Sequence, residues 1–115
     1  MPSMASIAIR DPDGDVRALI QHVLVRLGHT ILPESAEESA DVVVLEPASA
    51  PDVEAVRRLR ARNPSLPVVC LSILPPLPET LELEPATYVV KPFTIPDVRA
   101  AVDCAIRGLR ARRAC

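Results

Sequence analysis

Four short apolar runs recur along the chain, and a polar residue follows each of them. The runs cover residues 6–10, 41–45, 68–71 and 88–90. Short, continuous runs rich in β-branched residues are typical of strands buried on both faces of a parallel sheet. A weaker candidate covers residues 30–32. The pattern therefore predicts up to five strands in one buried sheet.

Helical periodicity fills most of the gaps between these runs. One helix is predicted to end at Gly28, a second to cover 53–59, and a third to cover 98–109. The first helix carries six apolar residues on one face, which we expect to be buried: Val16, Leu19, Ile20, Val23, Leu24 and Leu27. Strands that alternate with helices predict an α/β, doubly wound fold.

Two of the helix starts share a capping pattern. Ser49 and Thr94 are each followed by a proline in the first turn and by an acid three residues on, at Asp52 and Asp97. A hydroxyl N-cap with an acid at the third helical position predicts a capping box, in which each side chain accepts a hydrogen bond from the other residue's amide. We expect both helices to begin in this way.

Two connections are too short or too proline-rich for a full helix. Residues 33–40 leave room for two helical turns, so we expect a shortened second helix. Residues 73–85 contain four prolines, each costing about 3 kcal/mol inside a helix, so we expect a degenerate fourth helix of one turn at most, around 79–84. This segment contains four leucines: Leu74, Leu77, Leu81 and Leu83. They either form an apolar docking patch or fold back onto the sheet, and we favour folding back.

Composition limits the classes of protein that fit. The chain has 115 residues and a formal net charge of −2, and 49% of it is hydrophobic, which fits one folded domain over 1–115 and excludes intrinsic disorder. The near-neutral charge argues against a dedicated nucleic-acid binder. The uncharged run 66–78 is shorter than the roughly 20 apolar residues of a membrane span.

Cysteine and arginine usage adds further expectations. Cys70, Cys104 and Cys115 show no C-x-x-C spacing, which argues against a zinc site or a disulfide framework and favours a reducing cytoplasm. We expect Cys70 in the core and Cys115 at the surface. Residues 107–115 are interpreted as a frayed tail or a linker stub. A solvated helix face is expected for four arginines: Arg57, Arg58, Arg60 and Arg62.

The residues that end the predicted strands point to chemistry. In an open parallel sheet, ligands bind beyond the carboxyl ends of the strands. Here those ends present Asp11, Glu46, Ser72 and Lys91, the only lysine of the chain. Acids are hard oxygen ligands for a divalent cation, and a hydroxyl and an ammonium group would contact phosphoryl oxygens.

Four segments, 7–17, 41–46, 66–72 and 88–94, resemble the receiver domain of bacterial two-component response regulators. The Lys-Pro-Phe that starts at Lys91 is the most specific match. The resemblance implies a flavodoxin-like five-stranded parallel sheet in the order 2-1-3-4-5. It also implies an Asp that ends the third strand and accepts phosphate from a histidine kinase, a pair of acids that holds Mg²⁺, and a switch aromatic, here Tyr88.

The chain departs from the receiver pattern at two positions. Glu46 stands where the phosphoacceptor Asp is expected, and Pro12 replaces one acid of the metal pair. Asp11 and Asp13 remain as weak metal ligands, so the resemblance implies no cofactor, or Mg²⁺ held less tightly. The extra methylene of Glu46 moves its carboxylate from the in-line position on which phosphoryl transfer depends. We interpret the chain as an atypical receiver, or pseudo-receiver, and not as an enzyme.

Several residues also have simpler interpretations. Asp11 and Asp13 are good turn residues, and Asp13 can cap the first helix. Ser72 can bond to backbone, and Tyr88 can be a half-buried core ring. For Glu46 the simpler interpretation is a solvated acid at the edge of the sheet; our hypothesis is that it pairs with Lys91, accepts a hydrogen bond from Ser72, and so imitates the active state.

The favoured function is signal transduction by phosphorylation-independent protein–protein interaction. The partner would be a signalling or output protein, such as a histidine kinase, or a second copy in a homodimer, with no membrane and no direct nucleic-acid contact. Alternatives are a weak Mg²⁺-dependent phosphoacceptor in a phosphorelay, or a receiver from a longer regulator to which 107–115 leads. A flavodoxin-like binder of a small anion or nucleotide is disfavoured, because the three glycines form no G-x-G.

Overall fold

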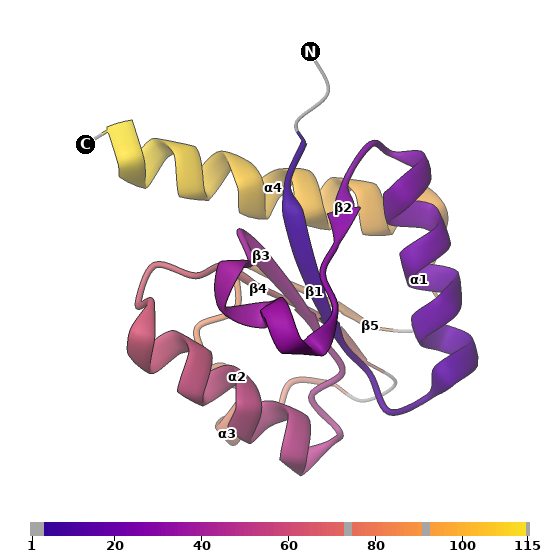
Figure 1. Ribbon diagram of the computed structural model, residues 1–115. Helices are drawn as coiled ribbons and strands as arrows, with labels where there is room; N and C mark the ends of the chain where they lie inside the picture. The colour runs from indigo at the N-terminus through magenta and orange to yellow at the C-terminus, as the bar shows by residue number, and fades with distance from the viewer. Residues whose placement is uncertain (1–3, 73–74, 91–92, 115) are drawn as a thin grey trace.

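A single parallel sheet forms the centre of the molecule. The computed structural model describes residues 4–72, 75–90 and 93–114. Its strands are β1 (Ser6–Arg10), β2 (Thr30–Ile31), β3 (Val42–Leu45), β4 (Val68–Ser72) and β5 (Thr87–Val90). They lie in the order β2-β1-β3-β4-β5, and every neighbouring pair is parallel (Figure 1). The α/β, doubly wound fold and the strand order are therefore confirmed.

Helices cover both faces of the sheet. α1 (Gly14–Arg26) and α4 (Ile95–Ala114) pack on one face, while η1 (Glu34–Ser39), α2 (Ala50–Arg62) and α3 (Pro78–Leu81) lie on the other (Figure 1). The shortened second helix is a 3₁₀ helix, and the fourth helical region is a single turn, as predicted. α4 continues to Ala114, so the backbone of 107–114 is helical, while a linker role for it stays a prediction.

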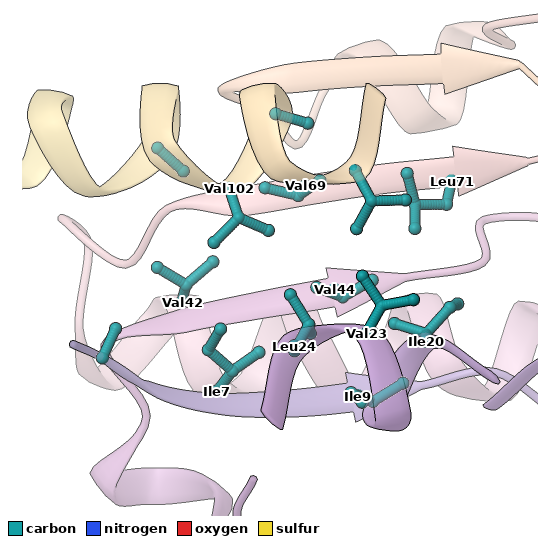
Figure 2. Packing of buried hydrophobic residues seen from close by; sticks show 14 of the residues in the cluster. Ile7, Ile9, Ile20, Val23, Leu24, Val42, Val44, Val69, Leu71 and Val102 are labelled. Carbon is teal, nitrogen blue, oxygen red and sulfur yellow. The ribbon is translucent and has the colours of Figure 1, made fainter. Parts of the chain in front are cut away.

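Alternate strand residues supply two apolar cores. Ile7 and Ile9 face α1 and α4, whereas Ala8 between them faces α2. Figure 2 shows the first core, in which Ile20, Val23 and Leu24 of α1 close over the strands. Each fully buried Val, Leu or Ile contributes about 1.5–3 kcal/mol relative to an exposed one. The sheet is thus held from both sides without any contribution from tryptophan.

The two ends of α1 follow their local sequence. The Asp13 carboxylate accepts hydrogen bonds from the amides of Asp15 (3.0 Å) and Val16 (3.3 Å), so Asp13 is the N-cap. Gly28 has a φ of 96°, a left-handed conformation that glycine adopts without steric cost. Leu19 is 56% exposed, so its predicted burial is wrong. It lies 100° around the helix from Ile20, beyond the stripe that the sheet covers.

Only one of the two predicted capping boxes forms. In α4, the Thr94 hydroxyl accepts from the Asp97 amide (3.2 Å), and the Asp97 carboxylate accepts from the Thr94 amide (2.7 Å). In α2, Ser49 is the N-cap residue, but its side chain makes no capping hydrogen bond. Asp52 instead accepts a hydrogen bond from Arg10 (3.3 Å). The prediction at α2 is wrong because a long-range ion pair takes the capping carboxylate.

The arginines of α2 do not all point to solvent. Arg57, Arg58 and Arg62 are exposed, as expected. Arg60 is half-buried, and its guanidinium donates to the carbonyl oxygens of Leu66 (2.6 Å) and Leu83. A solvated role for Arg60 is therefore wrong: this side chain ties α2 to the segments before β4 and β5.

The leucines of the proline-rich segment divide between core and surface. Leu83 is buried against the α2 face of the sheet, while Leu77 and Leu81 are 44% and 55% exposed. Leu74 lies outside the described residues. The expected folding back onto the sheet holds for Leu83 alone among the leucines described. Among the described residues, no helix is both long and apolar enough to cross a membrane.

Candidate functional site

Glu46 occupies the position directly after β3, the central strand of the sheet. Its amide donates to the carbonyl oxygen of Arg10 (2.8 Å), which holds the ends of β1 and β3 together. The side chain of a glutamate at a sheet edge would ordinarily extend into water, but Glu46 is only 6% exposed. A buried carboxylate of this kind needs hydrogen-bond donors around it.

Two donors meet one oxygen of this carboxylate. Oε1 of Glu46 accepts from the Ser72 hydroxyl at 2.8 Å and from the Ala48 amide at 3.0 Å. Ser72 ends β4 and is itself fully buried. The predicted hydrogen bond between Ser72 and Glu46 is therefore confirmed. Lys91 lies outside the described residues, so its pairing with Glu46 stays a prediction.

Cys70 lies on β4, two residues before Ser72, and belongs to the core as expected. It is fully buried, and burial together with the nearby Glu46 carboxylate raises the pKa of its thiol to about 12. A thiol with this pKa stays protonated at neutral pH and is a poor nucleophile. Cys104 is exposed, and Cys115 lies outside the described residues.

Asp11 and Asp13 adopt the turn geometry that was the simpler interpretation. Oδ1 of Asp11 accepts from the Asp13 amide at 2.8 Å, and Oδ1 of Asp13 caps α1. Within the described residues, no group of three or more His, Cys, Asp or Glu side chains is arranged to hold a metal ion. Because Pro12 offers no carboxylate, this donor set fits poorly the several oxygen ligands of a hard divalent cation.

Tyr88, the candidate switch aromatic, lies in β5 beside Cys70 of β4. It is half-buried and packs against the core under α2, together with Val53 and Leu59. The predicted half-buried ring is confirmed, while a switching role for Tyr88 stays a prediction.

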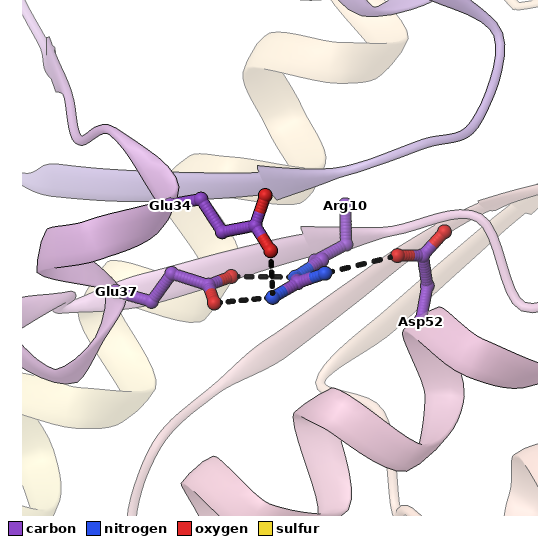
Figure 3. A network of polar contacts seen from close by, with 4 residues as sticks. All are labelled: Arg10, Glu34, Glu37 and Asp52. Atoms are coloured by element: carbon purple, nitrogen blue, oxygen red, sulfur yellow. Dashed lines mark hydrogen bonds and ion pairs between the residues drawn. The ribbon is translucent and has the colours of Figure 1, made fainter.

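Arg10 forms an ion-pair network that the sequence pattern did not indicate. It ends β1, and its guanidinium contacts three carboxylates from two other elements (Figure 3). Nε and Nη2 form a bidentate pair with Glu37, with 2.6 Å from Nε to Oε2. Glu34 and Asp52 lie 3.3 Å from Nη2 and Nη1. The Glu37 hydrogen bond is the main cause of a raised pKa of Arg10, which keeps it charged.

A signal for this network existed in the sequence. Arg10 is the one charged residue within its apolar run, and residues 34–38 hold three glutamates. Only the folded connection between β2 and β3 brings these charges together. The network borders a cavity of about 150 Å³ that Asp11 and Arg17 also line, so it lies next to the candidate site.

The sequence matches no family model, and no curated protein matches it either. Solved structures do match. NtrX from Brucella abortus in complex with ADP superposes with a TM-score of 0.82 and 18% identity over 97% of this chain, which spans 28% of the NtrX chain. A response regulator receiver domain protein from Clostridium thermocellum gives a TM-score of 0.77 with 21% identity, covering 96% of this chain and 99% of that one.

A third neighbour is the BeF3-activated receiver domain of DrrB, with a TM-score of 0.73 and 26% identity over 91% of this chain and 99% of that one. Each of these superpositions covers more than nine-tenths of this chain, so the likeness takes in its sheet and its helices. The chain therefore has the CheY-like receiver fold of response regulators, with Glu46 and Ser72 hydrogen-bonded to each other at the carboxyl ends of β3 and β4.

Proposed function

We propose that the chain acts in signal transduction as an atypical receiver that binds a protein partner without being phosphorylated. The observation that carries this proposal is the buried Glu46 carboxylate, which accepts hydrogen bonds from Ser72 and Ala48. In the receiver resemblance, the residue at position 46 would be the Asp that accepts phosphate. Here the same position carries a longer acid, one oxygen of which already accepts two hydrogen bonds within the protein.

The chemistry of phosphoryl transfer supports this view. Transfer depends on positioning and charge stabilisation, with the attacking oxygen in line with the leaving group and a divalent cation on the phosphoryl oxygens. Glu46 is one methylene too long for the position of an Asp, and one of its oxygens is held by two donors. Pro12 removes a carboxylate from the cation site. Each departure weakens the same reaction.

The hydrogen bond from Ser72 supports a constitutive state. A carboxylate at the end of β3 that draws in the hydroxyl at the end of β4 resembles the contact that an acyl phosphate would make. We infer that Glu46 imitates the phosphorylated acid, with Lys91 as its second partner. The module then signals through its surface, to a histidine kinase, an output protein or a second copy, and it performs no catalysis. A cytoplasmic location goes with this role.

Phosphorylation in vitro tests the proposal directly. The protein is incubated with acetyl phosphate and Mg²⁺, and its intact mass is measured. Wild type is expected to gain no phosphoryl group. The matched variant carries Pro12→Asp and Glu46→Asp, which restore both acids, and it is expected to gain one. A phosphoryl adduct on wild type that Glu46→Gln removes would overturn the proposal in favour of a weak Mg²⁺-dependent phosphoacceptor.

A further inference from the structure

η1 is attached to the rest of the molecule almost entirely by charges. None of its residues, Glu34–Ser39, is buried, so the helix adds nothing to either apolar core. Its glutamates bind arginines of two other elements: Glu34 and Glu37 bind Arg10 of β1, and Glu38 binds Arg62 of α2. An element without buried apolar contacts belongs to the least stable part of a fold.

Hollows surround η1. A groove of about 600 Å³ runs between η1 and α2, with Arg10, Leu59 and Arg62 among its lining residues. A second cavity of about 180 Å³ lies between η1 and the end of α2, and the cavity of about 150 Å³ beside Asp11 also borders η1. η1 therefore crosses a partly hollow surface and does not pack as a closed layer. We call Glu34–Ser39 the η1 strap. None of its own side chains has to leave the apolar core if it lifts.

Arg10 forms the main ion pairs that hold this strap in place. The side chains of Arg10 and Glu37 are 19% and 11% exposed, so solvent and salt screen this bidentate pair less than an exposed one. The pair between Glu38 and Arg62 is about 70% exposed on both sides and contributes little. The same guanidinium also holds Asp52, at 14% exposure, in the first turn of α2.

Asp52 also has a potential partner at the start of its own helix, the N-cap residue Ser49. Ser49 and Asp52 carry the capping-box pattern that forms at α4 between Thr94 and Asp97, yet at α2 the Ser49 side chain makes no capping bond. In this structure the Ser49 amide donates to the Glu46 carbonyl oxygen (3.3 Å) and not to Asp52. The Asp52 carboxylate thus binds Arg10 here, and the Ser49 amide of its own first turn is an alternative partner. Two alternative sets of contacts for one group are the basis of a two-state element.

We propose that Arg10 is a latch that holds the η1 strap closed, and that the strap opens as a unit when Asp52 leaves Arg10 to complete the capping box with Ser49. In the closed state Arg10 joins β1, η1 and α2. In the open state Glu34 and Glu37 are released to water, the groove beside α2 widens, and the start of α2 gains its local cap. The sheet stays intact in both states. The latch does not depend on whether Glu46 accepts phosphate.

Amide exchange measured by NMR on the full chain tests the latch. Ala36 and Ala40 donate the backbone hydrogen bonds of η1, to Pro33 and Glu37 (2.9 and 3.0 Å), and Val43 donates within the sheet, to Pro67 (3.1 Å). In Arg10→Leu, which suits an apolar strand, exchange at Ala36 and Ala40 is expected to rise about tenfold or more, with Val43 unchanged. Arg62→Ala, the control for an exposed pair, is expected to change these rates less than threefold.

The amide of Asp52 reports separately on the cap at the start of α2. Exchange of the Asp52 amide is expected to slow in Arg10→Leu, because the Ser49 hydroxyl then accepts from it, and to return to the wild-type rate in Arg10→Leu/Ser49→Ala. At about 1 M salt the Debye length falls to about 3 Å. This salt is expected to speed exchange of the Ala36 and Ala40 amides in wild type, but not in Arg10→Leu, where the ion pairs of Arg10 are already absent. Unchanged η1 exchange in Arg10→Leu, an equal rise at Val43, or an Asp52 amide that does not respond would each overturn the latch.

Discussion

At the scale of single residues, His29 shows how burial fixes a protonation state. Its ring is 6% exposed, and Nδ1 accepts a hydrogen bond from the Ala5 amide at 3.1 Å, so that nitrogen carries no proton. Burial lowers the pKa of His29 from its ordinary value of 6.5, and the charge of Asp103 opposes this only in part. The folded protein therefore prefers the neutral ring.

The pH dependence of stability follows from that preference. Because the pKa is lower in the folded chain, the unfolded chain binds the proton first, and the free energy of unfolding falls as pH drops below about 6.5. The contribution is complete above that pH and is lost by the time pH has passed the lower folded value. Urea unfolding at pH 7.5 and 5.5 measures the change in stability.

Two histidine variants isolate this effect from the acids, which also titrate as pH falls. His29→Asn keeps an acceptor near the position of Nδ1 and is expected to show a smaller loss between the two pH values than wild type. His22→Asn, at an exposed position on α1, is expected to keep the full wild-type loss. An equal pH dependence in wild type and His29→Asn would contradict the prediction.

The candidate site was predictable where backbone geometry alone decides the outcome. Glu46 follows β3 and Ser72 ends the neighbouring parallel strand β4, so the strand order places their side chains together and the hydrogen bond follows. Arg10 also ends a strand, but its partners depend on how the β2–β3 connection folds and on which way three glutamates turn. No periodicity in the sequence encodes that choice.

At the scale of elements, the two capping patterns show how tertiary contacts override local ones. Thr94 and Asp97 lie at an exposed helix start, and their box forms. Ser49 and Asp52 have the same spacing, but Arg10 reaches Asp52 and takes its carboxylate. A charge-assisted hydrogen bond to a guanidinium is stronger than one to a neutral amide. The sequence specifies both boxes, and the fold selects one.

This difference predicts unequal effects of two similar substitutions. Thr94→Ala removes a hydroxyl that accepts from the Asp97 amide and is expected to lower the free energy of unfolding by about 1 kcal/mol. Ser49→Ala removes a hydroxyl that makes no capping bond and is expected to change it by less than about 0.5 kcal/mol. Urea unfolding of both variants at one pH decides the matter. Similar losses in both would show that Ser49 caps α2 after all.

At the scale of the whole molecule, the two apolar cores share strands β1, β3, β4 and β5. Residues such as Ile7 and Ile9 enter the core under α1 and α4, while Ala8, between them on the same strand, enters the core under α2. A strand cannot lose its contacts on one face and keep its position on the other. We therefore expect the two cores to unfold together, as is usual for single domains of this size.

The composition of the chain provides a probe for this coupling. Tyr88 is the only tyrosine, there is no tryptophan, and Tyr88 packs on the core under α2. Its fluorescence therefore reports on that core, whereas circular dichroism reports on the helices as a whole. Leu24 of α1 is fully buried in the opposite core, and Leu19 of the same helix is 56% exposed, which supplies a matched control.

Leu24→Ala is expected to lower the free energy of unfolding by about 2–5 kcal/mol, through lost burial and the cavity it leaves. Because the cores share strands, the Tyr88 fluorescence transition in urea is expected to shift as far as the circular dichroism transition, although Tyr88 lies on the other face of the sheet. Leu19→Ala is expected to shift both by less than about 0.5 kcal/mol. A Tyr88 midpoint that stays at the wild-type value while the dichroism signal moves would mean that the two faces unfold independently, and that the sheet does not couple them.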